Sequence, residues 1–167
     1  MLPDVIELRV VTQEDWALWR RLRLSALAEA PHAFVSRLSD WQGEGDREER
    51  WRARLAIPGS HNLVAELDGE PVGITSGVPG EGAGVATLIS MWVSPQARGR
   101  GVADRLIGEV ERWALQTRAE VLKLAVTPGN EHAIVLYRRN GFDDAGEPGD
   151  LMPDGSGRER VLSKKLR

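Results

Sequence analysis

The chain contains no cysteine, which excludes disulfide bonds, thiolate metal ligands and thiol nucleophiles. It also lacks any hydrophobic run close to the ~20 residues that a membrane-spanning helix needs. The first residues, Met1 to Asp4, carry neither the basic segment nor the apolar core that directs secretion. These absences predict a cytoplasmic protein with no membrane partner, and we expect no metal.

The chain also lacks a large excess of either positive or negative charge. Lys and Arg number 22 and Asp and Glu number 25, so the formal net charge is −3. This balance argues against a general nucleic-acid binder, although it leaves room for a local basic pocket. With 167 residues, 41% of them hydrophobic, the chain is long enough to bury a core, and we expect residues 1–167 to form one domain.

Hydrophobic patterning predicts a mixture of strands and helices. Alternating or continuously apolar runs predict strands over 5–11, 61–67, 71–78, 85–93, 121–126, 142–147 and 159–166. Helical spacing predicts helices over 12–30, 46–57, 102–118 and 130–140, and loops over 31–45 and 148–157. This order predicts an α/β protein with a mixed sheet and helices on both faces.

Local signals support several of these elements. Thr12 and Asp15 form a capping box at the start of the first helix, and Asp68-Gly69 suits a tight hairpin turn. The buried faces of the first two helices are predicted from Trp16, Trp19, Leu22, Ala26 and Leu27 in one and from Trp51 and Leu55 in the other.

The segment 91–103 runs from an apolar strand through a proline and a basic glycine turn into a helix. A helix start leaves about four backbone N–H groups unpaired and carries roughly half a positive charge, so it attracts anions. Gly99 and Gly101 have no Cβ to hold an anion away, and Arg98 and Arg100 add donors suited to phosphate. The segment therefore predicts a phosphate site.

Two alternatives compete with a phosphate site of this kind. The turn can be an ordinary strand-to-helix connection with solvated arginines, because short glycine motifs recur by accident. A dinucleotide-binding Rossmann turn is disfavoured, because the turn comes after several strands and the Gly-x-Gly-x-x-Gly spacing fails at Asp104.

The glycine turn resembles the Arg/Gln-x-x-Gly-x-Gly/Ala signature of the GNAT superfamily of N-acetyltransferases, read as Arg98, Gly101 and Ala103. Gln96, Gly99 and Gly101 fit the same letters, but the later frame lies at the usual distance from the strand valine. Downstream, Asn130 and Tyr137 are followed by Gly141-Phe142, a spacing similar to the family's second cofactor segment, Asn-x₆-Tyr-x₃-Gly-Phe. Two signatures in this order identify the chain as a member of the superfamily.

The resemblance implies the GNAT fold, a mixed, mostly antiparallel sheet of about seven strands with four helices. It implies acetyl-CoA as cosubstrate, with pyrophosphate on the amides of residues 99–104 and pantetheine along residues 91–93. The implied cofactor-binding residues are Met91, Trp92, Val93, Arg98, Gly99, Arg100, Gly101, Val102, Ala103, Asp104, Asn130 and Tyr137. The structural alternative for Asn130 is a helix N-cap, and the residue can cap the helix and bind the cofactor at the same time.

The resemblance also implies catalytic roles. Tyr137, the chain's only tyrosine, is the candidate general acid for the CoA thiolate, and its alternative is a place on the apolar helix face. The amide of Val93 is the candidate donor to the thioester oxygen. The base is less well defined, since the strand 86–93 has no carboxylate, and Ser90 or a water chain is the candidate relay, with Glu66, Asp40 and His32 as distant candidates.

The acceptor is predicted to be a primary amine of a small molecule. Family resemblance places its pocket at the loops 31–45 and 148–157, where Asp40, Glu44, Asp150 and Asp154 accompany Phe34 and Trp41 and would suit a cationic amine. A protein or peptide acceptor is the alternative, which Ala125 disfavours because ribosomal-protein acetyltransferases place a glutamate there. A regulatory acyl-CoA-binding module is a third possibility. Relatives are monomers or homodimers, and no nucleic-acid partner is expected.

Overall fold

The computed structural model describes residues 4–167, so Met1 to Pro3, part of the segment judged to lack a secretion signal, lie outside it. In the described part the strands are β1 (Ile6–Val11), β2 (His61–Leu67), β3 (Glu70–Pro79), β4 (Val85–Val93), β5 (Val121–Val126), β6 (Asp143–Leu151) and β7 (Arg158–Lys165). The α-helices are α1 (Trp16–Glu29), α2 (Glu48–Leu55), α3 (Val102–Gln116) and α4 (Glu131–Arg139). None of these helices is long and apolar enough to cross a membrane.

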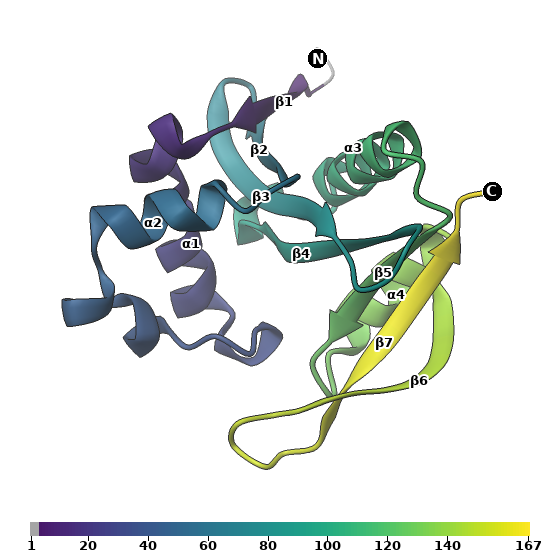
Figure 1. Ribbon diagram of the computed structural model, residues 1–167. Coiled ribbons are helices and arrows are strands. Elements are labelled where there is room, and N and C mark those ends of the chain that lie inside the picture. Colours follow the sequence, from purple (N-terminus) through teal and green to yellow (C-terminus); the bar gives the residue numbers. More distant parts are fainter. Residues whose placement is uncertain (1–3) are drawn as a thin grey trace.

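The strands form one sheet in the order β1-β2-β3-β4-β5-β7-β6 (Figure 1). Every neighbouring pair is antiparallel except β4 and β5, which run parallel. That pair holds together over only three positions, Val85–Thr87 against Val121–Lys123. The rest of β4 therefore lies free of β5, and the sheet opens in its middle.

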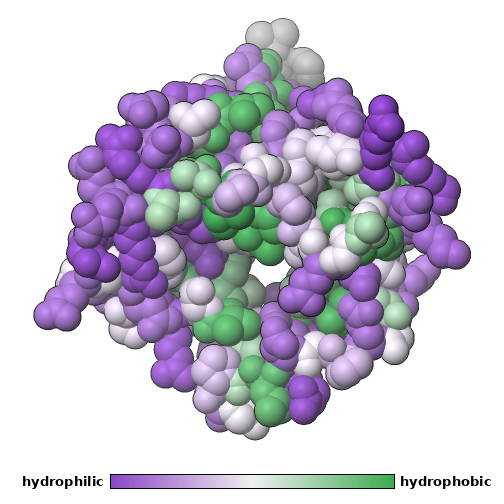
Figure 2. Space-filling model, viewed as in Figure 1, coloured by the Kyte–Doolittle hydropathy of each residue, from purple (hydrophilic) through white to green (hydrophobic). Residues whose placement is uncertain are grey.

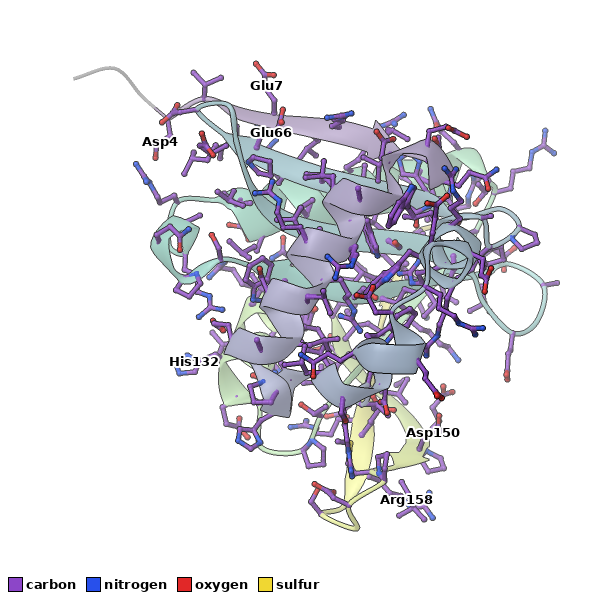
Figure 3. All side chains as sticks on the ribbon, turned by 90° about the vertical axis from the view of Figure 1, so that its left-hand side faces the viewer. Asp4, Glu7, Glu66, His132, Asp150 and Arg158 are labelled. Carbon is purple, nitrogen blue, oxygen red and sulfur yellow. The ribbon has the colours of Figure 1, made fainter. Side chains whose placement is uncertain are left out.

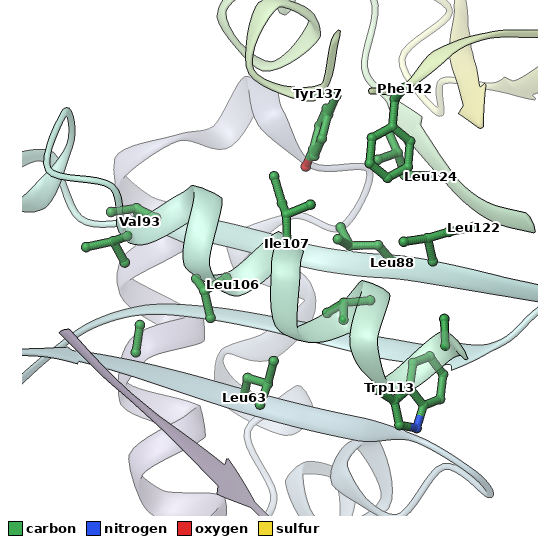
Figure 4. Packing of buried hydrophobic residues seen from close by; sticks show 14 of the residues in the cluster. Leu63, Leu88, Val93, Leu106, Ile107, Trp113, Leu122, Leu124, Tyr137 and Phe142 are labelled. Atoms are coloured by element: carbon green, nitrogen blue, oxygen red, sulfur yellow. The ribbon is translucent and has the colours of Figure 1, made fainter. Parts of the chain in front are cut away.

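Two hydrophobic clusters lie on opposite faces of the sheet, in agreement with the predicted α/β fold. Helices α3 and α4 cover one face, where the buried side chains include Leu63, Leu88, Leu106, Ile107, Val110, Leu122, Tyr137 and Phe142 (Figure 4). Helices α1 and α2 cover the other, with Val11, Trp19, Leu22, Ala26, Trp51, Leu55, Val64, Ile74 and Trp92. Alternation along β2 explains this division, because Leu63 and Ala65 belong to the first cluster and Val64 to the second.

The predicted hairpin turn is confirmed. Asp68 and Gly69 have φ values of 51° and 86°, and Leu67 pairs with Glu70 across them. Positive φ at both central residues is the geometry that matches the twist of the flanking strands. The predicted capping box is confirmed as well: the Thr12 side chain accepts from Glu14 and the Asp15 carboxylate accepts from the Thr12 amide.

The prediction that 148–157 is a loop is wrong in its first part. Strand β6 continues through Pro148 to Leu151, where Pro148 pairs with Arg160 and Leu151 with Arg158. Because β6 lies at the edge of the sheet, only one of its sides is paired, and such strands tolerate proline. The true loop is therefore confined to the residues between Leu151 and Arg158.

Candidate active site

A bulge in β4 creates the opening in the sheet. Ile74 pairs with Trp92 and Ser76 with Ile89, so Thr75 of β3 faces two residues of β4, Ser90 and Met91. Ser90 has a φ of 58°, in the left-handed region that serine rarely adopts. A bulge bends and twists its strand. The second half of β4 thus turns away from β5 and presents a free edge.

The free edge directs the backbone of Val93 into the opening. The amide of Ser94 donates to the carbonyl of Val72 on β3 at 2.7 Å. Because backbone groups alternate in direction along a strand, the N–H and C=O of Val93 point the opposite way, away from β3. The carbonyl accepts from Arg98 Nε at 3.0 Å. The Val93 amide therefore faces the gap, which is the direction that the donor role implied by the family resemblance requires.

A cavity of about 630 Å³ occupies the gap. Figure 2 shows the molecule hollowed there, with apolar side chains at the rim. Its lining comes from the end of α1 and the following turn (Glu29, Ala30, Ala33, Phe34), from β4 and the glycine turn (Met91, Trp92, Val93, Arg98, Ala103), and from β5 and α4 (Ala125, Val126, Asn130, His132, Ala133, Leu136, Tyr137). A narrow, largely apolar cleft of this kind suits an extended chain such as pantetheine.

The predicted phosphate turn has the backbone that the prediction requires. Gly99 and Gly101 have φ values of 78° and 86°, and Gly101 is the N-cap of α3. A Cβ built on Gly99 would meet no atom within 4 Å, so the space before the turn is open. A second cavity, of about 440 Å³, lies there, and both glycines line it with Val102, Ala103 and Asp104. The turn can admit an anion to the amides of α3.

The charged side chains of the turn are already engaged within the protein. Arg98 contacts the Val93 carbonyl and the carboxylate of Glu29. Arg100 makes a two-pronged pair with Asp4, at 2.8 and 2.7 Å. Asp104 accepts from Asn140 and Arg139, each at 2.9 Å, and these hydrogen bonds hold its pKa below the ordinary value. The amides, more than the arginine side chains, thus remain available to a phosphate.

Asn130 and Tyr137 both line the main cavity from α4. Asn130 Oδ1 accepts from the Ala133 amide at 3.3 Å, so the residue is the N-cap of the helix. Tyr137 is 7% exposed and packs edge-on against Phe142, with ring centroids 5.8 Å apart. In Figure 4 its hydroxyl points towards β4 and away from Phe142. Burial raises the pKa of Tyr137 above its ordinary value, which keeps the phenol protonated.

The candidates for the base are scattered. Ser90 accepts a hydrogen bond from Arg54 Nη2 at 3.1 Å. Glu66 faces Glu7 across β1 and β2, far from the cavity-lining His132 (Figure 3). The Asp40 carboxylate accepts from the Arg37 amide, and the His32 carbonyl accepts from Thr127 Oγ1 at 2.7 Å. Neither Glu66 nor Asp40 lines the cavity, and Glu29 is the carboxylate that does.

The predicted acceptor loops contribute unequally. Phe34, from the loop 31–45, lines the cavity, whereas no residue of 148–157 does. Trp41 packs against Trp51 with the rings tilted by 35° and their centroids 4.4 Å apart, and this contact makes it part of the fold. Trp92 both lines the cavity and packs in the α1–α2 cluster.

Sequence reasoning missed several residues of the site. His132, Leu136 and Arg139 line the cavity over the glycine turn. Leu136 follows His132 by four residues and Arg139 follows Leu136 by three, which places all three on one face of α4. Arg23 lies behind the cavity, against the ring of the lining residue Phe34, and is buried on α1 at four-residue spacing from Trp19 and Leu27. A cation inside an apolar stripe was the available signal.

Comparison with known proteins agrees with this geometry. A sequence profile of the Acetyltransferase (GNAT) family matches residues 19–142. The chain belongs to the GNAT acetyltransferase family. An uncharacterized N-acetyltransferase of Bacillus subtilis (strain 168), YhfO, is 32% identical over 115 residues, which are 66% of this chain and 75% of that protein.

Solved structures of acetyltransferases share the fold. The PaiA N-acetyltransferase of Thermoplasma acidophilum, crystallised with coenzyme A, has a TM-score of 0.75 at 19% identity, over 96% of this chain and 99% of that one. Nourseothricin acetyltransferase has a TM-score of 0.60 at 29% identity, over 66% and 67% of the two chains. This GNAT protein is therefore an acetyltransferase, and family membership makes acetyl-CoA its acyl donor.

Proposed function

We propose that residues 1–167 form one catalytic domain that transfers the acetyl group of acetyl-CoA to a primary amine of a small molecule. The observation that carries the proposal is a pair of adjoining cavities that share Val93 in their lining. One holds the inward-facing amide of Val93 and Tyr137, and the other is lined by the open turn at Gly99. The likeness to nourseothricin acetyltransferase, whose name denotes a small-molecule acceptor, supports this acceptor class.

Residues on both sides of the gap between β4 and β5 bind acetyl-CoA, the acetyl donor. The amides of residues 99–104 hold the pyrophosphate at the start of α3, where the helix dipole favours negative charge. The free edge of β4 at Met91 and Val93 pairs with pantetheine as an added strand would. Asn130 donates to a pantetheine carbonyl through its amide nitrogen while its oxygen caps α4. The apolar wall from Ala133 and Leu136 excludes water from the arm.

The acyl transfer balances without a covalent enzyme intermediate. The neutral amine adds to the thioester carbon, whose oxygen accepts from the Val93 amide. As the carbon–sulfur bond breaks, its electron pair goes to sulfur, which takes the hydroxyl proton of Tyr137. The proton that nitrogen loses on becoming an amide restores the phenol through Ser90 or water. The products are the N-acetylated amine and CoA thiol.

The test measures acetyl-CoA binding by calorimetry and then thiol release with a panel of amines and short peptides. We expect micromolar to millimolar binding and turnover of small amines. Absence of binding would refute the proposal. Binding with turnover of peptides alone would favour a protein acetyltransferase, and binding with no turnover would favour a regulatory acyl-CoA-binding module.

The pH profile should reflect the acceptor rather than Tyr137. An alkylammonium acceptor has a pKa near ~10.4, so kcat/KM should rise about tenfold per pH unit between about pH 6 and 9. Because burial raises the pKa of Tyr137, the acid stays protonated and causes no descending limb there. Glu29, Arg98 and His132 are the other titratable groups in the cavity. A descending limb below about pH 9 that Tyr137→Phe removes would contradict this assignment.

A further inference from the structure

Four buried or half-buried side chains that carry hydrogen-bond donors gather where α1 and α2 pack on β4. We call Trp19, Arg23, Arg54 and Trp92 the donor cluster. Trp19 and Trp92 belong to the same hydrophobic cluster, and the Arg54 guanidinium lies 5.1 Å from the centre of the Trp19 ring. Arg23 lies 4.6 Å from the centre of the Phe34 ring and close enough to Arg54 for their charges to repel.

The donor cluster contains many hydrogen-bond donors and few hydrogen-bond acceptors to pair with them. Trp19 Nε1, Arg23 Nη1 and Trp92 Nε1 are buried without any hydrogen-bond partner. Arg54 contacts only neutral oxygens, those of Ser76 and Ser90 at 3.1 Å and of Asn62 at 3.4 Å. Within residues 4–167 neither arginine pairs with a carboxylate.

Without a ligand, the unpaired donors of this cluster lower the stability of the folded protein. Arg23 is 9% exposed, and a buried donor without a partner costs about 1–3 kcal/mol. Burial, with the charge of Arg54, lowers the pKa of Arg23 to about 10, and burial lowers the pKa of Arg54 to about 10 as well. Both arginines therefore stay cationic at neutral pH. A local departure from good packing chemistry of this kind is expected at a functional site.

The donor cluster adjoins the cleft. Trp92 and Phe34 line the main cavity, and Arg54 holds Ser90 in the bulge next to Met91, another lining residue. The carboxylates that the sequence suggested for attracting a cationic amine, Asp40 and Asp150 among them, do not line this cavity. Glu29 does line the cavity, but it is paired with Arg98. Arg23 and Arg54 lie just behind the lining, Arg23 against the ring of Phe34 and Arg54 against Ser90. The charge that has no ionic partner on this side of the cavity is thus positive, opposite to the expectation from the loops.

We propose that the donor cluster binds a carboxylate of the acceptor, so that the substrate is an amino acid or another small amine that carries a carboxylate. Arginine suits this group because its planar fork matches the two carboxylate oxygens. The indole N–H groups of Trp19 and Trp92 gain the acceptors that they lack. The inference rests on the proposed acetyl transfer and narrows its acceptor class.

The test compares matched acceptors. The kcat/KM of acetyl transfer is measured for the common amino acids, for ω-amino acids such as 4-aminobutyrate, and for the carboxamide of each. We expect at least one carboxylate to exceed its carboxamide by tenfold or more. If the carboxamides or amines without a carboxylate are used equally well or better, the inference is overturned.

Variants test whether the donor cluster causes the preference for carboxylate over carboxamide acceptors. Arg23→Met and Arg54→Met should raise KM for the carboxylate acceptor at least tenfold and abolish its advantage over the carboxamide, with the KM for acetyl-CoA unchanged. Arg21→Met, an exposed neighbour on α1, is the matched control for loss of one charge and should change neither. A rise in the KM for acetyl-CoA instead would mean that the arginines serve its phosphates, and would overturn the inference.

Thermal stability separates binding from a structural role. Replacing a poorly paired buried cation by an apolar side chain is often neutral or stabilising. We therefore expect Arg23→Met to melt at or above the temperature of the wild type. A lower melting temperature with equal loss of activity on carboxylates and carboxamides would show a structural role and overturn the inference.

Two measurements on the unaltered protein keep the result interpretable. Propionate should inhibit acetyl transfer competitively against the acceptor, at least tenfold more tightly than propanamide, and equal inhibition would count against the cluster. Calorimetry with acetyl-CoA isolates the proposed function: absence of binding refutes acetyl transfer and this inference together, whereas binding with turnover of amines lacking a carboxylate refutes the inference alone.

Discussion

Replacing Tyr137 with phenylalanine should lower kcat by roughly a hundredfold or more, the range expected when a positioned general acid is removed. The ring should keep its edge contact with Phe142, because only the hydroxyl is lost. The dissociation constant of acetyl-CoA should stay within about twofold, since the hydroxyl acts on the leaving sulfur and contributes little to ground-state binding. Steady-state kinetics at saturating acceptor, with calorimetry for acetyl-CoA, measures both quantities.

Phe142→Leu is the matched control for this experiment. It disturbs the same aromatic contact within the core but leaves the phenol in place, so it should lower stability by about 1 kcal/mol or more with little change in kcat. If Tyr137→Phe retains full kcat, Tyr137 is a packing residue and another group protonates the thiolate.

Gly101→Val should weaken acetyl-CoA binding by roughly 5–150-fold, since backbone strain of ~1–3 kcal/mol converts to that range. The reason is the φ of 86°, which a β-branched residue adopts only under strain. Relief of the strain would turn the first amides of α3 away from the cavity that Gly101 lines. Calorimetric titration with acetyl-CoA, well below the melting temperature, measures the loss.

Gly108→Ala provides the comparison within the same helix. Gly108 has no positive φ, and a Cβ there would meet no atom within 4 Å. Alanine should therefore stabilise α3 by about 1 kcal/mol and leave acetyl-CoA binding unchanged. Should Gly101→Val lower stability but bind acetyl-CoA normally, the turn would be a structural connection only.

Local patterns foretold most of the secondary structure, and their few errors have a common origin. The hairpin at Asp68-Gly69 and the capping box at Thr12 depend on backbone groups only a few residues apart, so sequence reasoning was adequate. The length of β6 was not foreseen. Its residues Pro148 and Gly149 are typical of loops, and they lie in a strand because β7 runs beside them. Pairing with a neighbour overrode their own preference.

The candidate site likewise has features that local sequence predicts and features that only tertiary contacts create. The glycines at 99 and 101 could be recognised because positive φ and close backbone approach are properties of glycine itself. The direction of the Val93 amide depends instead on the bulge at Ser90 and on pairing with Val72. The engagement of Arg98 by Glu29 joins residues 69 positions apart. No short pattern encodes such a contact.

The sequence by itself determined the order of the strands and helices, the glycine turn of segment 91–103 and the Asn130–Tyr137 segment, because each is set by residues close together in the chain. That turn lines a cavity next to the one between β4 and β5, and the two cavities share Val93, Arg98 and Ala103. The tertiary structure alone decided which charged side chains lie behind the cavity between β4 and β5. Arg23 and Arg54 come from separate helices, and only folding brings their charges together in a place with no carboxylate partner among the described residues.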